Sequence, residues 1–207
     1  NTPVGSPRAR CLGTGPGRRG VMGVLAKAIL RSYPFGPLGT VRRFRRDPIG
    51  VQRHVLRTLL RTAARTEWGQ RFCFEELLRS PDLIAAFQAQ VPLQRYEAFQ
   101  EDHLRVLAGA ANVCWPGQFR YVATTAGTLS RGRILPASEA TIRNDLRFGR
   151  AMVLTYLAET GRVSCIRGGV LSLPGRVQSD PRYPGRIIGD MTGCIADYCL
   201  RQGRIRR

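Results

Sequence analysis

Apolar residues recur at helical spacing over residues 47–65, the first long stretch of the chain with a regular pattern. Asp47-Pro48 is a typical helix start, an N-cap residue followed by proline in the first turn. Apolar positions every three or four residues then predict a helix with one buried face. The side chains expected on that face are Val51, Val55, Leu56, Leu59, Leu60 and Ala63. Three arginines on another face, which we interpret as solvated, are Arg53, Arg57 and Arg61.

Similar signals predict more helices further along the chain. Ser80-Pro81 starts a helix that Pro92 ends, because proline can begin a helix but cannot continue one. The stretch Glu97–Leu107 is predicted to form another helical piece. Ser138 caps a long amphipathic helix, and Gly161 terminates it.

The chain before Asp47 gives weaker signals. Residues 1–20 are rich in glycine, proline and arginine and are expected to be disordered. Val21–Arg31 is a candidate for a short apolar helix, and the prolines and glycines of residues 34–39 then predict a break. We interpret residues 1–21 as a disordered segment or an upstream extension.

Segments with β-type composition follow this helical region. The run around Tyr121-Val122 and the short stretch Arg133–Leu135 are the first two predicted strands. Val163–Leu173 is a further strand candidate, and Gly185–Thr192 is predicted to be a strand and a loop. Ile195–Arg201 begins another helix. A helical region followed by strand–loop–strand–helix–strand indicates an α/β fold.

The loop between the first two predicted strands is the most informative segment of the chain. Its glycine and hydroxyl members are Thr124, Thr125, Gly127, Thr128, Ser130 and Gly132, and its cations are Arg131 and Arg133. Glycines let the backbone approach a ligand, hydroxyls donate to phosphate oxygens, and a cation neutralises their charge. The composition therefore indicates a polyanion site, with an ordinary surface loop as the alternative.

This loop is not a P-loop, although its glycine spacing is close to G-x-x-x-x-G-K-[ST]. Arg133 stands where the lysine should be, and Ile134 replaces the hydroxyl residue that binds Mg²⁺. A P-loop also opens directly into a helix, whereas this segment continues as a short strand that we expect Pro136 to stop. The pattern therefore excludes a nucleotidase of the P-loop class.

The loop resembles the phosphate-binding loop of adenylate-forming enzymes, in which Ser/Thr-rich, Gly-Thr and Ser-Gly elements precede a basic residue and the next strand. Motifs ahead of the loop narrow the resemblance. They are, in order, Thr66-Glu67-Trp68-Gly69, Phe87 with Val91-Pro92-Leu93, Tyr96-Glu97 and Val113-Cys114-Trp115-Pro116-Gly117. This order is similar to that of the Gretchen Hagen 3 (auxin-responsive promoter) family of acyl-acid amido synthetases, in its bacterial style. The resemblance runs from about Met22 to the last residue.

The resemblance implies an adenylate-forming fold, with residues 22–207 as an incomplete N-terminal portion of the large adenylation domain. The enzyme would activate a small carboxylic acid with ATP and Mg²⁺ and then join it to an amine or amino acid. The implied phosphate-binding residues are Thr124, Thr125, Gly127, Thr128, Ser130, Gly132 and Arg133. Catalytic residues stay unassigned. The Mg²⁺ ligands, the adenine and ribose residues and a C-terminal lid would lie beyond residue 207, so this piece alone would be inactive.

The loop departs from the family pattern at several positions. Leu129 replaces a hydroxyl residue, Ala126 replaces Ser or Gly, and Arg131 stands where glycine is usual. The stretch from Gly127 to the basic residue is one residue shorter than usual, and arginine replaces lysine, which keeps the charge but changes its geometry. These departures leave a degenerate, non-catalytic homologue as the alternative function.

The formal net charge of +19 suggests a third function, a basic module that binds nucleic acid or another polyanion. Lys27 is the only lysine among the 33 basic residues, a bias that indicates GC-rich coding. The sequence contains no zinc spacing, RNA-recognition motif or helix-turn-helix signature. We therefore rank nucleic-acid binding below the enzymatic function. The arginine-rich first 46 residues also leave an organellar transit peptide as an open alternative.

Other site chemistry has little support. The six cysteines form no C-x-x-C pair, and only two histidines are present, so no metal site is expected in this chain. A hydrolase triad would need His103, which we place on a surface or half-buried helix position. Glu101-Asp102 we interpret as solvated carboxylates. The cysteine usage predicts a cytoplasmic protein, and no apolar run reaches the ~20 residues that a membrane span needs. The oligomeric state stays open.

Overall fold

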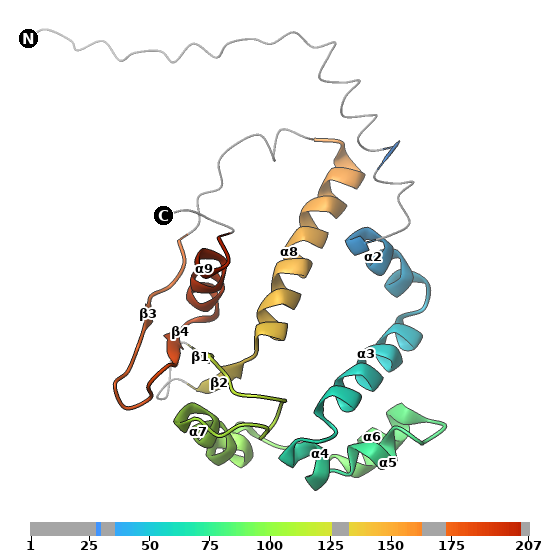
Figure 1. Ribbon diagram of the computed structural model, residues 1–207. Coiled ribbons are helices and arrows are strands. Elements are labelled where there is room, and N and C mark those ends of the chain that lie inside the picture. Colours follow the sequence, from blue (N-terminus) through green and yellow to red (C-terminus); the bar gives the residue numbers. More distant parts are fainter. Residues whose placement is uncertain (1–27, 30–35, 126–132, 163–172, 204–207) are drawn as a thin grey trace, which may run out of the picture.

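The computed structural model describes residues 28–29, 36–125, 133–162 and 173–203 (Figure 1). Helices occupy most of the N-terminal half of the described chain, and a small mixed sheet with two flanking helices follows. The fold is therefore α/β, as the sequence predicts.

The helix predicted from Asp47 is present as α3 (Pro48–Ala63). The Asp47 carboxylate accepts a hydrogen bond from the Gly50 N–H at 2.8 Å, which satisfies one of the free donors of the first turn. This cap depends only on neighbouring residues, and the prediction of the helix start is confirmed.

The buried stripe predicted for α3 is only partly covered. Leu60 and Ala63, near the C-terminal end of the helix, are buried. Val55 and Leu59 were expected on the same face, but they are 49% and 47% exposed. Leu56 packs against the same buried cluster as Leu60 and Ala63, so the covered stripe of α3 is narrower than the sequence predicts.

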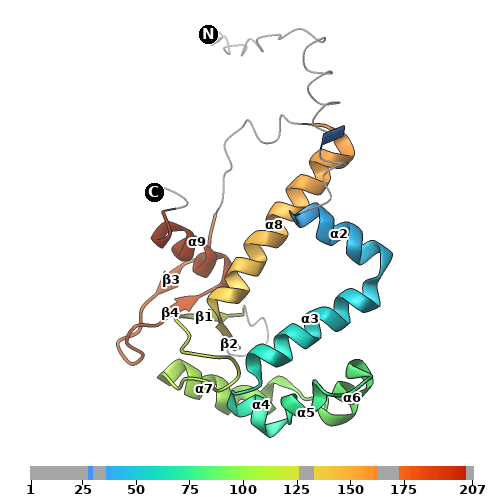
Figure 2. The ribbon, with the colours of Figure 1, turned by 45° about the vertical axis from the view of Figure 1, so that its right-hand side comes forward.

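A helix, α2 (Gly36–Arg46), lies where the sequence predicts a break. Proline is accepted in the first turn of a helix because its missing N–H would have no partner there. Gly36 has a φ of 74°, a left-handed conformation that favours glycine. Leu38 is buried, and α2 packs against the long helix α8 (Glu139–Thr160), as Figure 2 shows. Gly36 and Pro37 therefore lie at the start of a helix.

Three short helices follow α3, namely α4 (Glu67–Arg71), α5 (Phe74–Leu77) and α6 (Leu83–Gln90). The sequence predicts only the last of them, and it places the start at the wrong residue. The N-cap of α6 is Asp82, whose carboxylate accepts from the Ala85 N–H at 3.2 Å. A buried cluster holds this region together and consists of Leu60, Ala63, Phe72, Phe74, Leu77 and Leu83.

The predicted helix over residues 97–107 is confirmed, and it begins with a tighter turn. A 3-10 turn, η1 (Tyr96–Phe99), runs directly into α7 (Gln100–Ala108). Gly109 ends α7 with a φ of 112°, which a glycine adopts readily. The tight turn places the side chains of Tyr96 and Glu97 at the N-terminal end of this unit, beside the sheet.

The sheet has four strands in the order β2-β1-β4-β3. β1 (Tyr121–Thr124) pairs antiparallel with β2 (Ile134–Ala137) and parallel with β4 (Ile187–Gly189). β3 (Val177–Gln178) pairs antiparallel with β4 on the far edge. β1 and β2 thus form a hairpin, and the glycine-rich loop connects them at the end marked by Thr124 and Ile134.

Pro136 lies inside β2 and does not stop it, contrary to the prediction. β2 is an edge strand, so every second N–H points away from β1. The N–H of Ile134 points to this open edge, and Pro136 occupies the equivalent position two residues later. A residue without an N–H loses no ladder hydrogen bond there, and it blocks pairing with another strand.

The long helix α8 and a second helix, α9 (Met191–Arg201), cover one face of the sheet. Tyr121, Ala137 and Ile187 form one row across β1, β2 and β4 and pack against both helices. The predicted ends of α8 are confirmed. Ser138 caps it at 3.1 Å from the Thr141 N–H, and Gly161 follows its last turn in a left-handed conformation.

Two predictions concern the C-terminal part of the chain. The predicted start of the last helix is wrong, and a predicted strand falls almost entirely outside the described residues. α9 begins before the predicted Ile195, because Asp190 is its N-cap and accepts from the Gly193 N–H at 2.7 Å. The short strand β3 was not predicted. Of the predicted strand Val163–Leu173, residues 163–172 lie outside the described residues. None of the described helices has the length and apolar character required to cross a membrane.

Candidate phosphate-binding site

The root of the glycine-rich loop is held by a pair of hydrogen bonds between its two ends. The Thr125 N–H donates to the Arg133 carbonyl at 3.0 Å, and the Arg133 N–H donates to the Thr125 hydroxyl oxygen at 3.0 Å. Thr124 ends β1 directly before this pair. The structure therefore brings three of the predicted site residues together. The other four, Gly127, Thr128, Ser130 and Gly132, lie outside the described residues.

The Arg133 side chain, directly before β2, is exposed and lies over an aromatic ring. Its guanidinium carbon is 5.1 Å from the centre of the Tyr96 ring. Its Nη2 is 3.8 Å from the Glu97 carboxylate, and the two side chains are 56% and 65% exposed. An ion pair at this distance and exposure is weak. Arg133 is thus a solvent-accessible cation whose position depends largely on the Tyr96 ring.

Tyr96 also binds the backbone of β2. Its hydroxyl accepts a hydrogen bond from the Ile134 N–H at 2.8 Å and lies 3.2 Å from the Ile134 carbonyl oxygen, to which it can donate. The sequence resemblance includes Tyr96-Glu97 as a family motif but assigns no role to either residue. No signal within the sequence connects these residues to the loop, because 38 positions separate Tyr96 from Ile134.

His103 lies behind Tyr96 and is buried, so the prediction of a surface or half-buried histidine is wrong. Its ring lies 5.7 Å from the Tyr96 ring, 6.3 Å from the Trp68 ring and 6.4 Å from the Phe99 ring. Its Nδ1 has no hydrogen-bond partner within the described part of the chain. Burial lowers the pKa of His103, and the Ile134 carbonyl and the Asp102 charge oppose this shift only in part.

Asp102 is also buried, which corrects its assignment as a solvated carboxylate. It accepts hydrogen bonds from the Trp68 indole N–H at 2.7 Å and from Arg71 at 3.0 Å, and its other oxygen lies 3.2 Å from Arg105. Burial alone would raise its pKa, but these hydrogen bonds and the arginine charges outweigh burial, and the pKa of Asp102 is lowered. The carboxylate therefore links α4 to α7.

The family motif Thr66-Glu67-Trp68-Gly69 has a structural explanation. Thr66 is the N-cap of α4 and accepts from the Gly69 N–H at 3.1 Å. A Cβ atom at Gly69 would collide with the backbone carbonyls of Ala63 and Ala64, so this position requires glycine. Trp68 then carries its indole to Asp102. The motif thus supports the α7 unit that presents Tyr96 to the loop.

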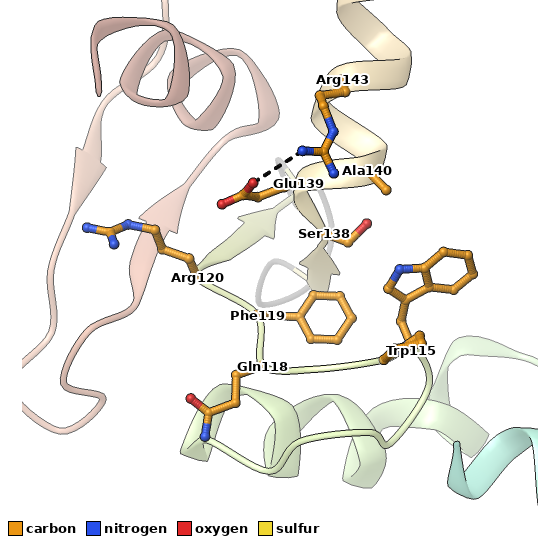
Figure 3. A pocket seen from close by; sticks show the side chains of 9 residues that line it. Trp115, Gln118, Phe119, Arg120, Ser138, Glu139, Ala140 and Arg143 are labelled. Atoms are coloured by element: carbon orange, nitrogen blue, oxygen red, sulfur yellow. Dashed lines mark ion pairs between the residues drawn. The ribbon is translucent and has the colours of Figure 1, made fainter. Parts of the chain in front are cut away.

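A cavity of about 210 Å³ lies at the other end of the hairpin (Figure 3). Its lining residues are Trp115, Pro116, Gln118, Phe119, Arg120, Ser138, Glu139, Ala140 and Arg143. The pairs Tyr121↔Ala137 and Thr124↔Ile134 mark the two ends of the hairpin, and the cavity adjoins the first pair. Arg143 faces Glu139 at 3.5 Å, which compensates its charge. This cavity is therefore separate from the candidate phosphate site.

Together, these features define an α/β protein. Its N-terminal helices support the hairpin of β1 and β2, and the long helix α8 follows the hairpin. The family model described as the GH3 family N-terminal domain matches residues 37–168. The chain therefore belongs to the GH3, or Gretchen Hagen 3, family, as its sequence resemblance indicates. The matched range includes the hairpin, the glycine-rich loop and all of α8. A comparison with curated proteins found no match.

Proposed function

We propose that this protein is the N-terminal part of an ATP-dependent acyl-acid amido synthetase and that its hairpin loop binds the ATP phosphates. One observation carries the proposal: a GH3-family chain places a hydroxyl, Thr125, and an exposed cation, Arg133, together at the root of a glycine-rich loop. Hydroxyls, backbone N–H groups and a cation are the groups that stabilise a leaving pyrophosphate.

The proposed reaction has two steps. A carboxylate oxygen of the acid attacks the α-phosphorus of ATP, the α–β phosphoanhydride bond breaks, and pyrophosphate leaves. The amine nitrogen then attacks the acyl carbon, and AMP leaves as the amide forms and the nitrogen loses a proton. Mg²⁺ would neutralise part of the phosphate charge in the first step. Groups of three or more His, Cys, Asp or Glu side chains able to hold a metal are absent from the described residues.

Thr125 and Arg133 would have different roles in the first step. The Thr125 hydroxyl oxygen already accepts from the Arg133 N–H, so its own proton stays available for a phosphate oxygen. Arg133 would supply the positive charge. Thr128 and Ser130 are the further hydroxyl candidates, and Gly127 and Gly132 would allow the loop to turn and its N–H groups to approach the phosphates.

The test is carboxylate-dependent ATP–pyrophosphate exchange. It is run on the full-length product of the gene with a panel of small carboxylic acids, and on the 207-residue chain for comparison. We expect exchange with at least one acid in the full-length product and none in the 207-residue chain. Absence of exchange with every acid, in protein shown to be folded, would favour the degenerate homologue that the altered loop leaves open.

The first prediction compares the two arginines of the loop. Arg133→Ala should slow exchange far more than Arg131→Ala, because Thr125 holds the Arg133 backbone and the Arg133 guanidinium lies over the Tyr96 ring. Loss of one charge-assisted phosphate contact, about 1.5–3 kcal/mol, corresponds to a roughly 10- to 150-fold slower reaction. Equal and small effects would contradict the assignment of Arg133. The loop is one residue shorter than the family pattern. A larger effect of Arg131→Ala would mean that this one-residue gap lies elsewhere in the loop than we assume.

A further inference from the structure

We propose that Tyr96 is a positioning residue for the phosphate site: it fixes the entrance of β2 and holds the Arg133 guanidinium in place. This inference rests on the proposed function for its link to phosphate. The contacts that motivate it belong to the described residues and are independent of any ligand. They involve two different parts of the tyrosine side chain, the hydroxyl and the ring.

The Tyr96 hydroxyl completes the open edge of the sheet at the point where the loop rejoins it. β2 is an edge strand, so the N–H and carbonyl of Ile134 have no partner strand and face the η1–α7 unit, where the carbonyl also acts on His103. The hydroxyl lies 2.8 Å from the Ile134 nitrogen and 3.2 Å from its oxygen, and it can accept from one and donate to the other. On the opposite side, Thr125 holds Arg133. The chain is therefore fixed from both sides at two consecutive residues.

The Tyr96 ring acts on the side chain of Arg133. The guanidinium lies 5.1 Å from the ring centre, within the range of a cation–π contact. The Glu97 carboxylate is the other partner of the guanidinium, but an ion pair of 3.8 Å between two side chains that are more than half exposed holds an arginine loosely. The Tyr96 ring thus does most to fix the position of the Arg133 guanidinium. A phosphate group could displace the loosely bound Glu97 carboxylate.

Tyr96 is itself held in a fixed position. It begins η1, which continues into α7 without a break. Its ring packs against the buried His103 ring, and the Phe99 ring lies 4.8 Å from that of Trp68. Trp68 is bound to Asp102 on α7. Because the Tyr96 ring is anchored to this cluster, its hydroxyl can hold the start of β2 in place. A surface tyrosine on a free loop could not do this.

Two substitutions separate the two contacts. Tyr96→Phe removes the hydroxyl and keeps the ring over Arg133, whereas Tyr96→Leu removes both. Tyr183 offers a matched control, since Arg182 lies 5.6 Å from its ring at a distant surface turn. Tyr183→Leu therefore removes an arginine–tyrosine contact of the same kind without touching the hairpin.

The experiment measures amide hydrogen exchange at Ile134 by NMR, and binding of Mg²⁺–pyrophosphate by calorimetry, in the full chain. Tyr96→Phe should speed Ile134 exchange about 10-fold relative to Ile188 of β4 and weaken pyrophosphate binding roughly 2- to 5-fold. Tyr96→Leu should weaken binding by about a further 2- to 5-fold, a loss that disappears when Arg133 is already alanine. Tyr183→Leu should change neither quantity.

The exchange and binding measurements test different parts of the proposal. If Tyr96→Phe leaves Ile134 exchange unchanged, Tyr96 does not fix the strand and the inference is wrong, whatever the pyrophosphate result. If exchange rises but both variants bind pyrophosphate as tightly as the wild type, the contact is structural and the positioning role is overturned. If the wild-type chain binds no pyrophosphate, the phosphate function itself fails, and the exchange data alone decide whether Tyr96 holds the strand.

Discussion

His103 is a titratable ring enclosed by aromatic side chains beneath the candidate site. Its Nδ1 has no partner among the described residues, and burial lowers its pKa. The folded state therefore prefers the neutral ring, whereas the unfolded chain binds a proton near pH 6.5. As the pH falls below that value, the unfolded state takes up more protons than the folded state. Stability is thus greatest above this range and is lost on acidification.

A second prediction follows for histidine substitution. The free energy of unfolding of the wild type should fall between pH 7.5 and pH 5.5, by at most about 1.4 kcal/mol, because this window extends only one pH unit below the pKa of the unfolded histidine. His103→Gln should remove most of this slope. Urea unfolding at the two pH values measures it, and His54→Gln, at the exposed histidine on α3, is the matched control. A slope that persists in His103→Gln but disappears in His54→Gln would contradict the prediction.

At the scale of elements, two carboxylates link α4 to α7, and only one of them, Asp102, is buried. The Asp102 carboxylate accepts hydrogen bonds from Trp68 and Arg71 of α4. Arg105 of α7 also donates two hydrogen bonds of 2.7 Å to the Glu67 carboxylate of α4. The neighbouring helix ends are joined by backbone hydrogen bonds from the start of α4 to residues 112–113. This connection holds the aromatic cluster against which Tyr96 packs.

A third prediction concerns this link. Asp102→Asn keeps an acceptor for the Trp68 indole but removes the charge that faces two arginines, so it should cost about 1–3 kcal/mol at neutral pH. The pKa of Asp102 is lowered in the folded state, so its contribution is present above about pH 4 and is lost on further acidification. Urea unfolding at pH 7 and pH 3 tests both parts. Glu101→Gln, at the exposed neighbouring residue, should have little effect, and an equal loss in the two variants would contradict the link.

Elements specified by neighbouring residues were predictable from the sequence, and those specified by distant contacts were not. The caps Asp47, Ser138 and Gly161 act within a few residues, so the start of α3 and both ends of α8 are predicted correctly. The helices α4 and α5 and the strand β3 are too short to show a periodic pattern. They form because the surrounding structure supplies their partners.

The same distinction applies to the candidate site. The composition of the loop sufficed to select Thr125 and Arg133, which the structure brings into contact. The burial of Asp102 could not be deduced, because adjacent helix positions look equally solvated until the indole of Trp68 is placed beside one of them. Tyr96 was found only through the fold, since its partner Ile134 belongs to a different element.

For the whole molecule, the net charge of +19 leaves polyanion binding as a competing function. The structure changes how this function must be tested. Deleting the first 46 residues would remove α2, whose Leu38 is buried and which packs on α8. Arginines 42, 45 and 46 of α2 line a cavity of about 380 Å³ together with Glu159 of α8. A deletion that ends before Gly36 leaves this contact intact.

The last prediction uses that shorter deletion. We expect the chain to bind duplex DNA in low salt and to lose more than about 10-fold in affinity between 50 and 150 mM salt, because each neutralised phosphate contributes a slope of about 0.9 in log–log form. Removal of residues 1–35 should reduce this slope, since it removes five arginines and Lys27, and should leave pyrophosphate binding at the hairpin unchanged. Fluorescence anisotropy at several salt concentrations measures the slope. Tight DNA binding that persists at 150 mM salt and disappears in the deletion variant would identify the N-terminal segment as a polyanion-binding module. If, in addition, Arg133→Ala loses pyrophosphate binding and the deletion variant keeps it, the chain carries two separate sites, one for DNA and one for pyrophosphate.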